Sequence, residues 1–320
     1  MRQNKHRNGG ILALIAFLFI FTAACAGPAS ESSDSVEEGG KLNVVVTTTH
    51  LSDLARDIGG GHVEVTGLMG PGVDPHGYEP APSDIEAIRD ADLVGYNGLH
   101  LEAMFVDIFE KMRQTDSNVF ALEDAISEED VLDYKYEGKD LEKDPHIWFD
   151  IDLWKASARL VADEFSRMDP EHEADYQANY EDYVVRLDEL EDYIEDKVAE
   201  LPEDQRILIT AHDAFSYFGE NYGFQVEGIQ GINSQTEAGT ADISLTADLV
   251  ADKGVKACFI ESSVSDRNIQ ALIEAVEVQG AAIEIGGELF SDALGTEEEN
   301  AGNYFDAYRT NVDTIVDSLK

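Results

Sequence analysis

Residues 171–202 read EHEADYQANYEDYVVRLDELEDYIEDKVAELP, and their apolar and aromatic residues recur at steps of three and four. These residues are Tyr176, Tyr180, Tyr183, Leu187, Leu190, Ile194, Val198 and Leu201. Acidic residues fill the opposite face, so the pattern predicts one amphipathic helix of about 30 residues that ends before Pro202. At about 1.5 Å per residue such a helix is roughly 45 Å long, longer than a typical single lobe.

Short β-branched segments alternate with helical patterns on both sides of this helix. Before it we expect strands at 42–49, 63–68 and 93–96 and helices at 50–58, 83–89, 101–114 and 151–167. After it we expect strands at 207–211, 226–229, 255–260 and 282–285 and helices at 242–253, 266–278 and 304–319. Strands that alternate with helices predict parallel βαβ units.

The two series predict an α/β protein with two Rossmann-like parallel-sheet lobes, at residues 41–170 and 203–320. One long rigid linking helix, at 171–202, joins them. An apolar stripe of this length is also typical of a coiled-coil dimer. Its position between two βα series favours a helix that crosses both lobes, and we expect a monomer.

The first 24 residues have the pattern of a secretory signal peptide. Three basic residues precede the apolar segment 11–21, and Ala23-Ala24 precedes Cys25. An apolar segment this short is typical of a signal peptide rather than of a membrane-spanning helix. The Ala-Ala-Cys sequence resembles the bacterial lipobox, whose cysteine takes a diacylglyceryl thioether and becomes the mature N-terminus. We therefore expect Cys25 to carry a lipid anchor.

An ordinary signal peptide cut near Ala24 is the alternative, because Thr22 stands where the lipobox usually has leucine. Residues 25–40 have almost no apolar content after the cysteine, and such a segment cannot bury enough surface to offset the entropy of ordering. We expect them to form a flexible tether between the anchor and the folded lobes.

Charge and cysteine content exclude several classes of protein. The chain carries 66 acidic and 22 basic residues, a formal net charge of −44. Such a surplus disfavours nucleic acid and anionic lipid headgroups as partners. Its self-repulsion is tolerable where salt screens it, which favours a halophilic source, or it keeps an exported protein soluble. Cys258 is the second of only two cysteines, so we expect no internal disulfide and a buried thiol.

The tripeptide Asp-Pro-His occurs twice, as Asp74-Pro75-His76 and Asp144-Pro145-His146, each followed two residues later by an aromatic residue. Proline fixes its own φ and biases the preceding residue towards extended backbone, so each histidine is presented by a stiff loop. A third histidine, His212, lies at the C-terminal end of an expected strand. Three histidines in such positions indicate a metal site.

A carboxylate completes the expected site. Asp292 follows the strand predicted at 282–285, and ligands of open α/β sheets bind at the carboxyl ends of strands. Three imidazoles and a carboxylate suit a borderline divalent cation, Zn²⁺ or Mn²⁺. Two ligands from each side of the linking helix would place the ion in the cleft between the lobes. Asp74 and Asp144 are candidates to cap their loops or to orient the imidazoles as hydrogen-bond acceptors.

Seven motifs resemble those of the metal-binding receptors of zinc and manganese ABC importers, a family of lipid-anchored or periplasmic solute-binding proteins. They occur in family order and span essentially all of residues 41–320. They are GVDPHGYEP (72–80), YNGLHLE (96–102), DPHIWFD (144–150), AHDAFSYF (211–218), EAG (237–239), ESSV (261–264) and GELFSDALG (287–295).

The resemblance implies two α/β lobes joined by one long helix, and metal ligands at His76, His146, His212 and Asp292. It also implies a receptor that is held at the extracytoplasmic face of the cell membrane by a lipid. Such a receptor captures zinc or manganese and delivers it to a membrane permease and its ATPase.

The resemblance does not fix the identity of the metal ion, because the chain is most similar to a mixed subgroup that handles zinc, manganese or both. Zinc-specific members often carry a histidine-rich acidic loop, whereas residues 124–144 contain acids and no histidine. Manganese receptors often have glutamate at the third ligand position, where this chain has His212. Glu261, in the motif ESSV, is a candidate to support the site beside the cleft or, equally, to cap a strand end through the backbone.

Two other functions compete with that of a metal receptor. A zinc-dependent hydrolase could use three protein nitrogens and a water. A fourth protein ligand would close such a site, and the chain has no His-Glu-x-x-His helix. A lipid-anchored adhesin with a purely structural metal is the other alternative. Reversible metal uptake by a folded apo-protein would separate a receptor from this adhesin.

Replacing Cys25 with serine should release the protein from the membrane fraction into the medium or periplasm, because the thioether cannot form. Cell fractionation and immunoblotting measure the distribution. Thr22→Leu, which brings the segment closer to the usual lipobox, should leave the protein in the membrane fraction. A Cys25→Ser variant that stays with the membrane would contradict the lipid anchor.

Overall fold

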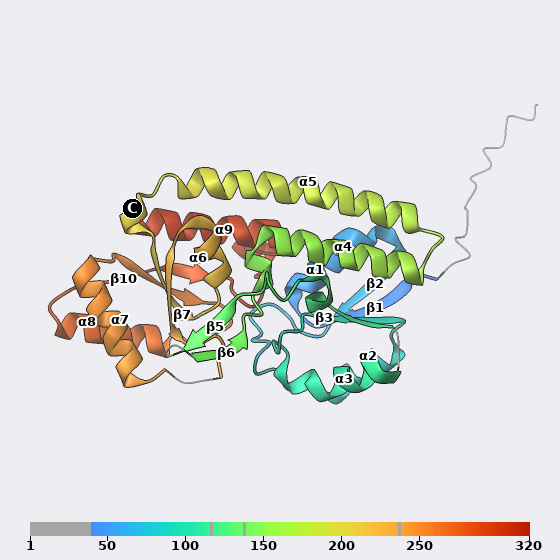
Figure 1. Ribbon diagram of the computed structural model, residues 1–320, viewed down its shortest axis with the longest axis horizontal. Helices are drawn as coiled ribbons and strands as arrows, with labels where there is room; N and C mark the ends of the chain where they lie inside the picture. The colour runs from blue at the N-terminus through green and yellow to red at the C-terminus, as the bar shows by residue number, and fades with distance from the viewer. Residues whose placement is uncertain (1–39, 116–117, 137–138, 236–237) are drawn as a thin grey trace, which may run out of the picture. The chain divides into compact units, whose positions relative to one another are not determined.

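The computed structural model describes residues 40–115, 118–136, 139–235 and 238–320 (Figure 1). Residues 41–320 form one compact unit. The predicted signal peptide, Cys25 and the tether up to residue 39 lie outside the described residues, as does Glu237 of the EAG motif. None of the helices in the described ranges is long and apolar enough to cross a membrane.

The N-terminal lobe contains a four-stranded parallel sheet in the order β2-β1-β3-β4. Its strands are β1 (Leu42–Val46), β2 (Val63–Gly67), β3 (Leu93–Tyr96) and β4 (Val119–Ala121). Its helices are α1 (Thr49–Gly59), α2 (Pro82–Asp90), α3 (Val106–Thr115) and α4 (Ile151–Met168). All of β3 and the last three residues of β1 (44–46) are buried, as expected for the central strands of a parallel sheet.

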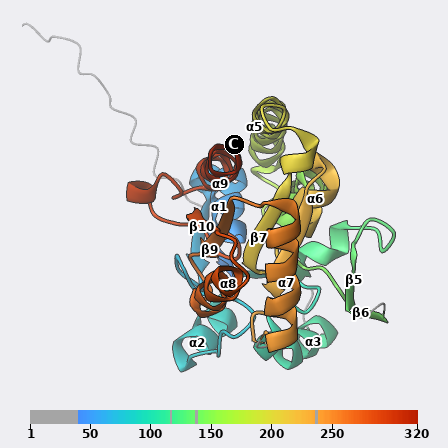
Figure 2. The ribbon, with the colours of Figure 1, turned by 90° about the vertical axis from the view of Figure 1, so that its left-hand side faces the viewer.

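The C-terminal lobe also combines parallel strands with helices, but its strands form two two-stranded sheets. Strand β7 (Ile207–His212) pairs in parallel with β8 (Gln225–Gln230), and β9 (Ala257–Glu261) pairs in parallel with β10 (Glu284–Leu289). Strands β7 and β9 lie next to each other. The helices are α6 (Ser216–Tyr222), α7 (Thr240–Lys253), α8 (Arg267–Val278) and α9 (Tyr304–Leu319). Figure 2 shows α7 and α8 side by side on the outside of this lobe. The predicted α/β class with parallel sheets is confirmed.

The linking helix is α5, Glu173–Val198, with 26 residues and therefore a length of about 39 Å. Six of its eight predicted stripe positions are buried within the helix, and Leu201 is buried just beyond its end. The stripe packs on α4 and α1 at one end and on α9 at the other (Figure 1). Because helices of the same chain cover the stripe, it is not free to form the alternative coiled coil.

Apart from the 3₁₀ turns, three features of the described residues were not predicted from the sequence: one strand, one helix and one hairpin. Strand β4 has only three residues, and α6 has seven, too few to show a hydrophobic period. The third element is an antiparallel hairpin of β5 (Asp133–Tyr136) and β6 (Lys139–Lys143). Its sequence is mostly charged, so it lacks the alternation of a half-buried strand. Figure 2 shows it projecting from the side of the lobes.

The strand predicted at 282–285 lies further along the chain, at Glu284–Leu289. Its register shifts between Ile285 and Gly287, and a Cβ at Gly286 would meet Phe259 and Ser318 at 2.7 Å. A glycine pair weakens a strand prediction, yet here it permits a bulge and close packing. Because β10 ends at Leu289 rather than at Ile285, Asp292 lies three residues after the end of the strand.

Candidate metal centre

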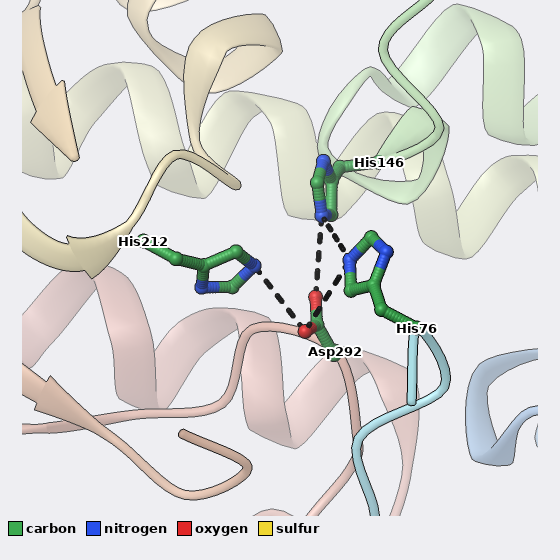
Figure 3. A group of neighbouring side chains, drawn as sticks. All are labelled: His76, His146, His212 and Asp292. Atoms are coloured by element: carbon green, nitrogen blue, oxygen red, sulfur yellow. Dashed lines mark hydrogen bonds and ion pairs between the residues drawn. The ribbon is translucent and has the colours of Figure 1, made fainter. Parts of the chain in front are cut away.

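Four buried side chains converge between the lobes: His76, His146, His212 and Asp292 (Figure 3). One nitrogen or oxygen atom of each lies within 4.8 Å of the others. The carboxylate is central, with Oδ1 3.3 Å from Nε2 of His146 and Oδ2 3.2 Å from Nε2 of His212. Nε2 of His76 lies 3.8 Å from Oδ2 and 3.4 Å from Nε2 of His146.

Each lobe supplies two of these side chains. His76 lies in the loop between β2 and α2, and His146 lies between β6 and the 3₁₀ turn Ile147–Phe149. His212 is the last residue of β7, and Asp292 follows β10. His76, His212 and Asp292 follow parallel strands, as expected for ligands at the carboxyl ends of an α/β sheet, whereas His146 follows β6 of the antiparallel hairpin.

The two Asp-Pro-His segments form the same local turn. Oδ1 of Asp74 accepts a hydrogen bond from the His76 backbone N–H at 2.8 Å, and Oδ1 of Asp144 accepts one from the His146 backbone N–H at 2.9 Å. Such turns are characteristic of aspartate two residues before the donor, and the intervening proline leaves the pattern undisturbed because it has no N–H to pair. The repeated tripeptide therefore presents each histidine in a fixed frame.

Carboxylates fix the rings of two histidines. Oδ1 of Asp144 also lies 2.7 Å from Nδ1 of His146. Oε2 of Glu261 lies 2.6 Å from Nδ1 of His212, while Oε1 accepts from the His212 backbone N–H at 2.9 Å. With Nδ1 occupied, each ring directs Nε2 towards Asp292, as is typical of metal-ligating histidines.

Glu261 and the two aspartates differ in what they contact. Glu261 bonds both the ring and the backbone of His212, so both roles considered for it are present, and it accepts a 2.5 Å hydrogen bond from Oγ of Ser291. Asp144 likewise caps its loop and orients its imidazole. Asp74 caps its loop, and its second oxygen accepts hydrogen bonds from Ser234 and Gln235.

The centre has unsatisfied buried polar atoms. In the described part of the chain, both carboxylate oxygens of Asp292 and Nε2 of His212 are buried without a hydrogen-bond partner of good geometry. A buried carboxylate in this state is costly unless a cation compensates it. The arrangement therefore suits a positive ion between the three Nε2 atoms and the carboxylate, and the described residues contain no other such group of potential ligands.

Burial and neighbouring charges shift the pKa of each of the four side chains of the centre. Burial disfavours imidazolium at His146, but the charges and hydrogen bonds of Asp144 and Asp292 outweigh it and raise its pKa to about 9. In the same way Asp292 and Glu261 overcome burial and raise the pKa of His212 well above its usual value.

The pKa values of His76 and Asp292 are lowered instead. Burial lowers the pKa of His76 to about 3 despite the charge of Asp292. Burial alone would raise the pKa of Asp292, but the histidines around it hold that pKa well below its usual range. The upward pKa shifts of His146 and His212 favour these two histidines as the groups that compensate the carboxylate when no metal is bound.

A tryptophan that the sequence analysis did not assign to the site packs against it. The ring of Trp148 lies 5.3 Å from that of His146, and its Nε1–H donates to the carbonyl of Ser291 at 2.9 Å. His50 stacks on Trp148 with ring centroids 4.7 Å apart. The sequence feature that could have indicated this contact is the aromatic residue that follows each Asp-Pro-His by two positions.

The remaining described histidines lie outside the four-residue cluster. His62 and His172 stack on each other at 3.9 Å and pair with Asp175 and Asp169, whereas His100 is exposed.

Known proteins resemble this chain over nearly its whole length. A family model described as zinc-uptake complex component A, periplasmic, matches residues 44–318. Manganese-binding lipoprotein MntA of Bacillus subtilis (strain 168) is 38% identical over 314 residues, which cover 98% of this chain and 100% of MntA. Manganese ABC transporter substrate-binding lipoprotein PsaA of Streptococcus pneumoniae serotype 4 is 28% identical over 315 residues, or 97% of this chain and 98% of PsaA.

A solved structure shares the fold. Zinc-binding protein TroA of Treponema pallidum is 40% identical over 288 residues, covering 90% of this chain and 92% of TroA. The structure of the periplasmic zinc-binding protein TroA superposes with a TM-score of 0.83 and covers 88% of this chain and 99% of that chain.

Replacing Glu261 with glutamine should weaken Zn²⁺ binding by about ten- to hundredfold, because the amide cannot accept from both N–H groups of His212 and lacks the charge. Titration against a competing chelator measures the dissociation constant. Glu288→Gln, an exposed change in β10, is the matched control and should bind as the parent does. Parent-like affinity in the Glu261→Gln variant would show that this carboxylate does not support the centre.

Proposed function

The chain belongs to the family of periplasmic component A proteins of zinc-uptake complexes, and on this premise we propose that it is an extracytoplasmic metal receptor. It captures Zn²⁺ or Mn²⁺ as cargo and delivers the ion to an ABC importer. The observation that carries this function is the buried carboxylate of Asp292, which lies among three imidazoles at the junction of two lobes and has no hydrogen-bond partner of good geometry.

In this proposal His76, His146, His212 and Asp292 are the metal ligands. Three neutral imidazoles and one carboxylate bind a divalent cation through nitrogen and oxygen donors that zinc and manganese both accept. Asp144 and Glu261 hold two of the rings, so little ring motion has to be lost when the ion binds. Because each lobe supplies two ligands, a displacement of one lobe weakens two bonds together and offers a route to release.

The location and organisation of the receptor follow from the same premise. MntA and PsaA are described as lipoproteins, which supports a lipid anchor on Cys25 at the outer face of the cell membrane. Residues 25–40 would then tether an N-terminal lobe (41–170), a linking helix (171–202) and a C-terminal lobe (203–320). The partners of this monomer are the importer's permease and its ATPase, and the acidic surface disfavours nucleic acid.

The receptor is proposed to have no enzymatic activity. The relatives are described by metal binding and transport, and a fourth protein ligand leaves a tetrahedral ion without an open position for water. Turnover of ester, peptide or lactam substrates by the zinc-loaded protein would favour the hydrolase instead. A metal that cannot be removed without unfolding the chain would favour an adhesin with a structural ion.

Substituting alanine for any one of His76, His146, His212 or Asp292 should weaken Zn²⁺ binding by about tenfold or more, since a ligand is worth at least as much as the group that orients it. Calorimetric titration of the metal-free protein measures affinity and stoichiometry, and the parent should bind one ion reversibly. Zn²⁺ should bind more tightly than Mn²⁺, because affinity rises towards the later divalent metals.

His62→Ala and His172→Ala are the matched controls, and both should bind as the parent does. A variant at His212 or Asp292 with parent-like affinity would remove that residue from the ligand set. Tighter Mn²⁺ than Zn²⁺ binding would contradict the proposed donor set.

Metal affinity should fall as the pH is lowered, because the ion must displace protons from the ligands. The raised pKa values of His146, about 9, and of His212 mean that both are protonated at neutral pH in the metal-free centre. We therefore expect about two protons released per Zn²⁺ at pH 7, and fewer as the pH rises through 9. Calorimetry in buffers of different ionisation enthalpy counts them. Zinc binding without proton release at pH 7 would contradict this charge state.

A further inference from the structure

The two carboxylate oxygens of Asp74 accept hydrogen bonds from different lobes. Oδ1 accepts the His76 backbone N–H within its own loop, at 2.8 Å. Oδ2 accepts from Oγ of Ser234 at 2.7 Å and from Nε2 of Gln235 at 2.9 Å, both in the loop that follows β8 of the C-terminal lobe. The partners lie 160 and 161 positions away in the sequence. One carboxylate therefore ties the loop that carries His76 to the opposite lobe.

Gln235 also lies against the residue that follows His76. A Cβ at Gly77 would meet Nε2 of Gln235 at 2.3 Å, so any side chain at this position would displace the Gln235 amide. The Gln235 amide thus contacts both Asp74 and Gly77, the two sides of the His76 turn. His76 itself is only 4% exposed, although its loop lies at the surface.

Two other contacts between the lobes near the centre are deeply buried. Nε1–H of Trp148 donates to the carbonyl of Ser291 at 2.9 Å, and the hydroxyl of Tyr304 donates to the Trp148 carbonyl at 2.7 Å. By contrast, Asp74 and Ser234 are half-buried and Gln235 is exposed. The Asp74 contacts therefore lie on the solvent side of the centre, where an ion can leave with the least disruption of the core.

We propose that Asp74, Ser234 and Gln235 form an inter-lobe latch that sets the rate at which the bound metal ion leaves. The inference rests on the proposed receptor function and goes beyond it, because none of the three residues is a proposed ligand. While the latch is closed, the loop of His76 is held against the C-terminal lobe, which supplies His212 and Asp292. Release requires both hydrogen bonds to Oδ2 to break, and hydrogen bonds to a charged acceptor are the stronger kind.

The latch predicts an effect on dissociation rather than on association, since variants of one binding site usually differ more in dissociation rate than in association rate. Ser234→Ala combined with Gln235→Ala removes both donors to Oδ2 and leaves the Oδ1 bond to His76 intact. We expect the Zn²⁺ dissociation rate to rise by about tenfold or more, with an association rate within about threefold of the parent. Stopped-flow mixing of the zinc-loaded chain with excess chelator measures dissociation.

The matched control is Ser244→Ala combined with Gln270→Ala, the same two changes in α7 and α8 outside the latch. Gly77→Ala is a second test, because its methyl group displaces Gln235 without removing a donor, and it should also speed dissociation. Thermal unfolding of each metal-free variant checks that it is folded. Should the double variant unfold, Gly77→Ala and Asp74→Asn decide the question.

A parent that binds no Zn²⁺ would overturn the receptor function itself. A parent that binds Zn²⁺, beside folded latch variants that release it at the rate of the parent and the control, would overturn the latch alone. Faster release in the latch variants with an unchanged control supports the latch.

Discussion

The buried charge of Asp292 is the constraint around which the centre is organised. A carboxylate with no exposure and no conventional hydrogen-bond donor can persist only where positive charge compensates it. Asp144 and Glu261 add two more carboxylates, each behind an imidazole. The three acids carry a charge of about −3 when ionised, and two imidazolium protons bring the cluster to about −1.

A divalent cation bound to neutral imidazoles gives the same total. Exchange of two protons for one metal ion therefore leaves the net charge of the buried cluster unchanged. Since reorganising charge in a low-dielectric interior is the costly part of such an exchange, the scaffold around the cluster does not have to rearrange to accommodate it. The carboxylates behind His146 and His212 thus serve both states: they stabilise the protonated rings and keep the deprotonated rings aimed at the ion.

Local patterns in the sequence predicted the parts of this molecule that depend on local physics. The period of residues 171–202 predicted α5, and the repeated Asp-Pro-His predicted two stiff loops, which the structure shows to share the same aspartate hydrogen bond. The C-terminal end of α5 was placed too far along the chain, because the apolar stripe continues to Leu201 after the helix has ended at Val198.

What the sequence could not supply depends on tertiary contact between distant segments. Glu261 is 49 residues from His212, and an acid at a strand end in a chain with 66 acidic residues carries no sign of its partner. The contact of Asp74 with Ser234 is equally invisible, because neither residue has a periodic or motif context that points to the other. Short elements such as β4 form because the sheet accepts them, not because three residues favour a strand.

The scale of motion needed for release follows from the chemistry of coordination. Zinc holds nitrogen and oxygen ligands at about 2.0–2.2 Å, and a site tolerates deviations of only about 0.2 Å. With two ligands on each lobe, a relative shift of about one ångström is enough to break the coordination. Helices α5 and α9 bridge the structure and restrict larger movements, since α5 packs on α4, α1 and α9 and α9 contacts α1 and β10. A receptor of this design has no need of a wide hinge: the rigid helix and the short coordination distances together make a small tilt sufficient, and the hydrogen bonds on the solvent side of the centre determine how often that tilt occurs.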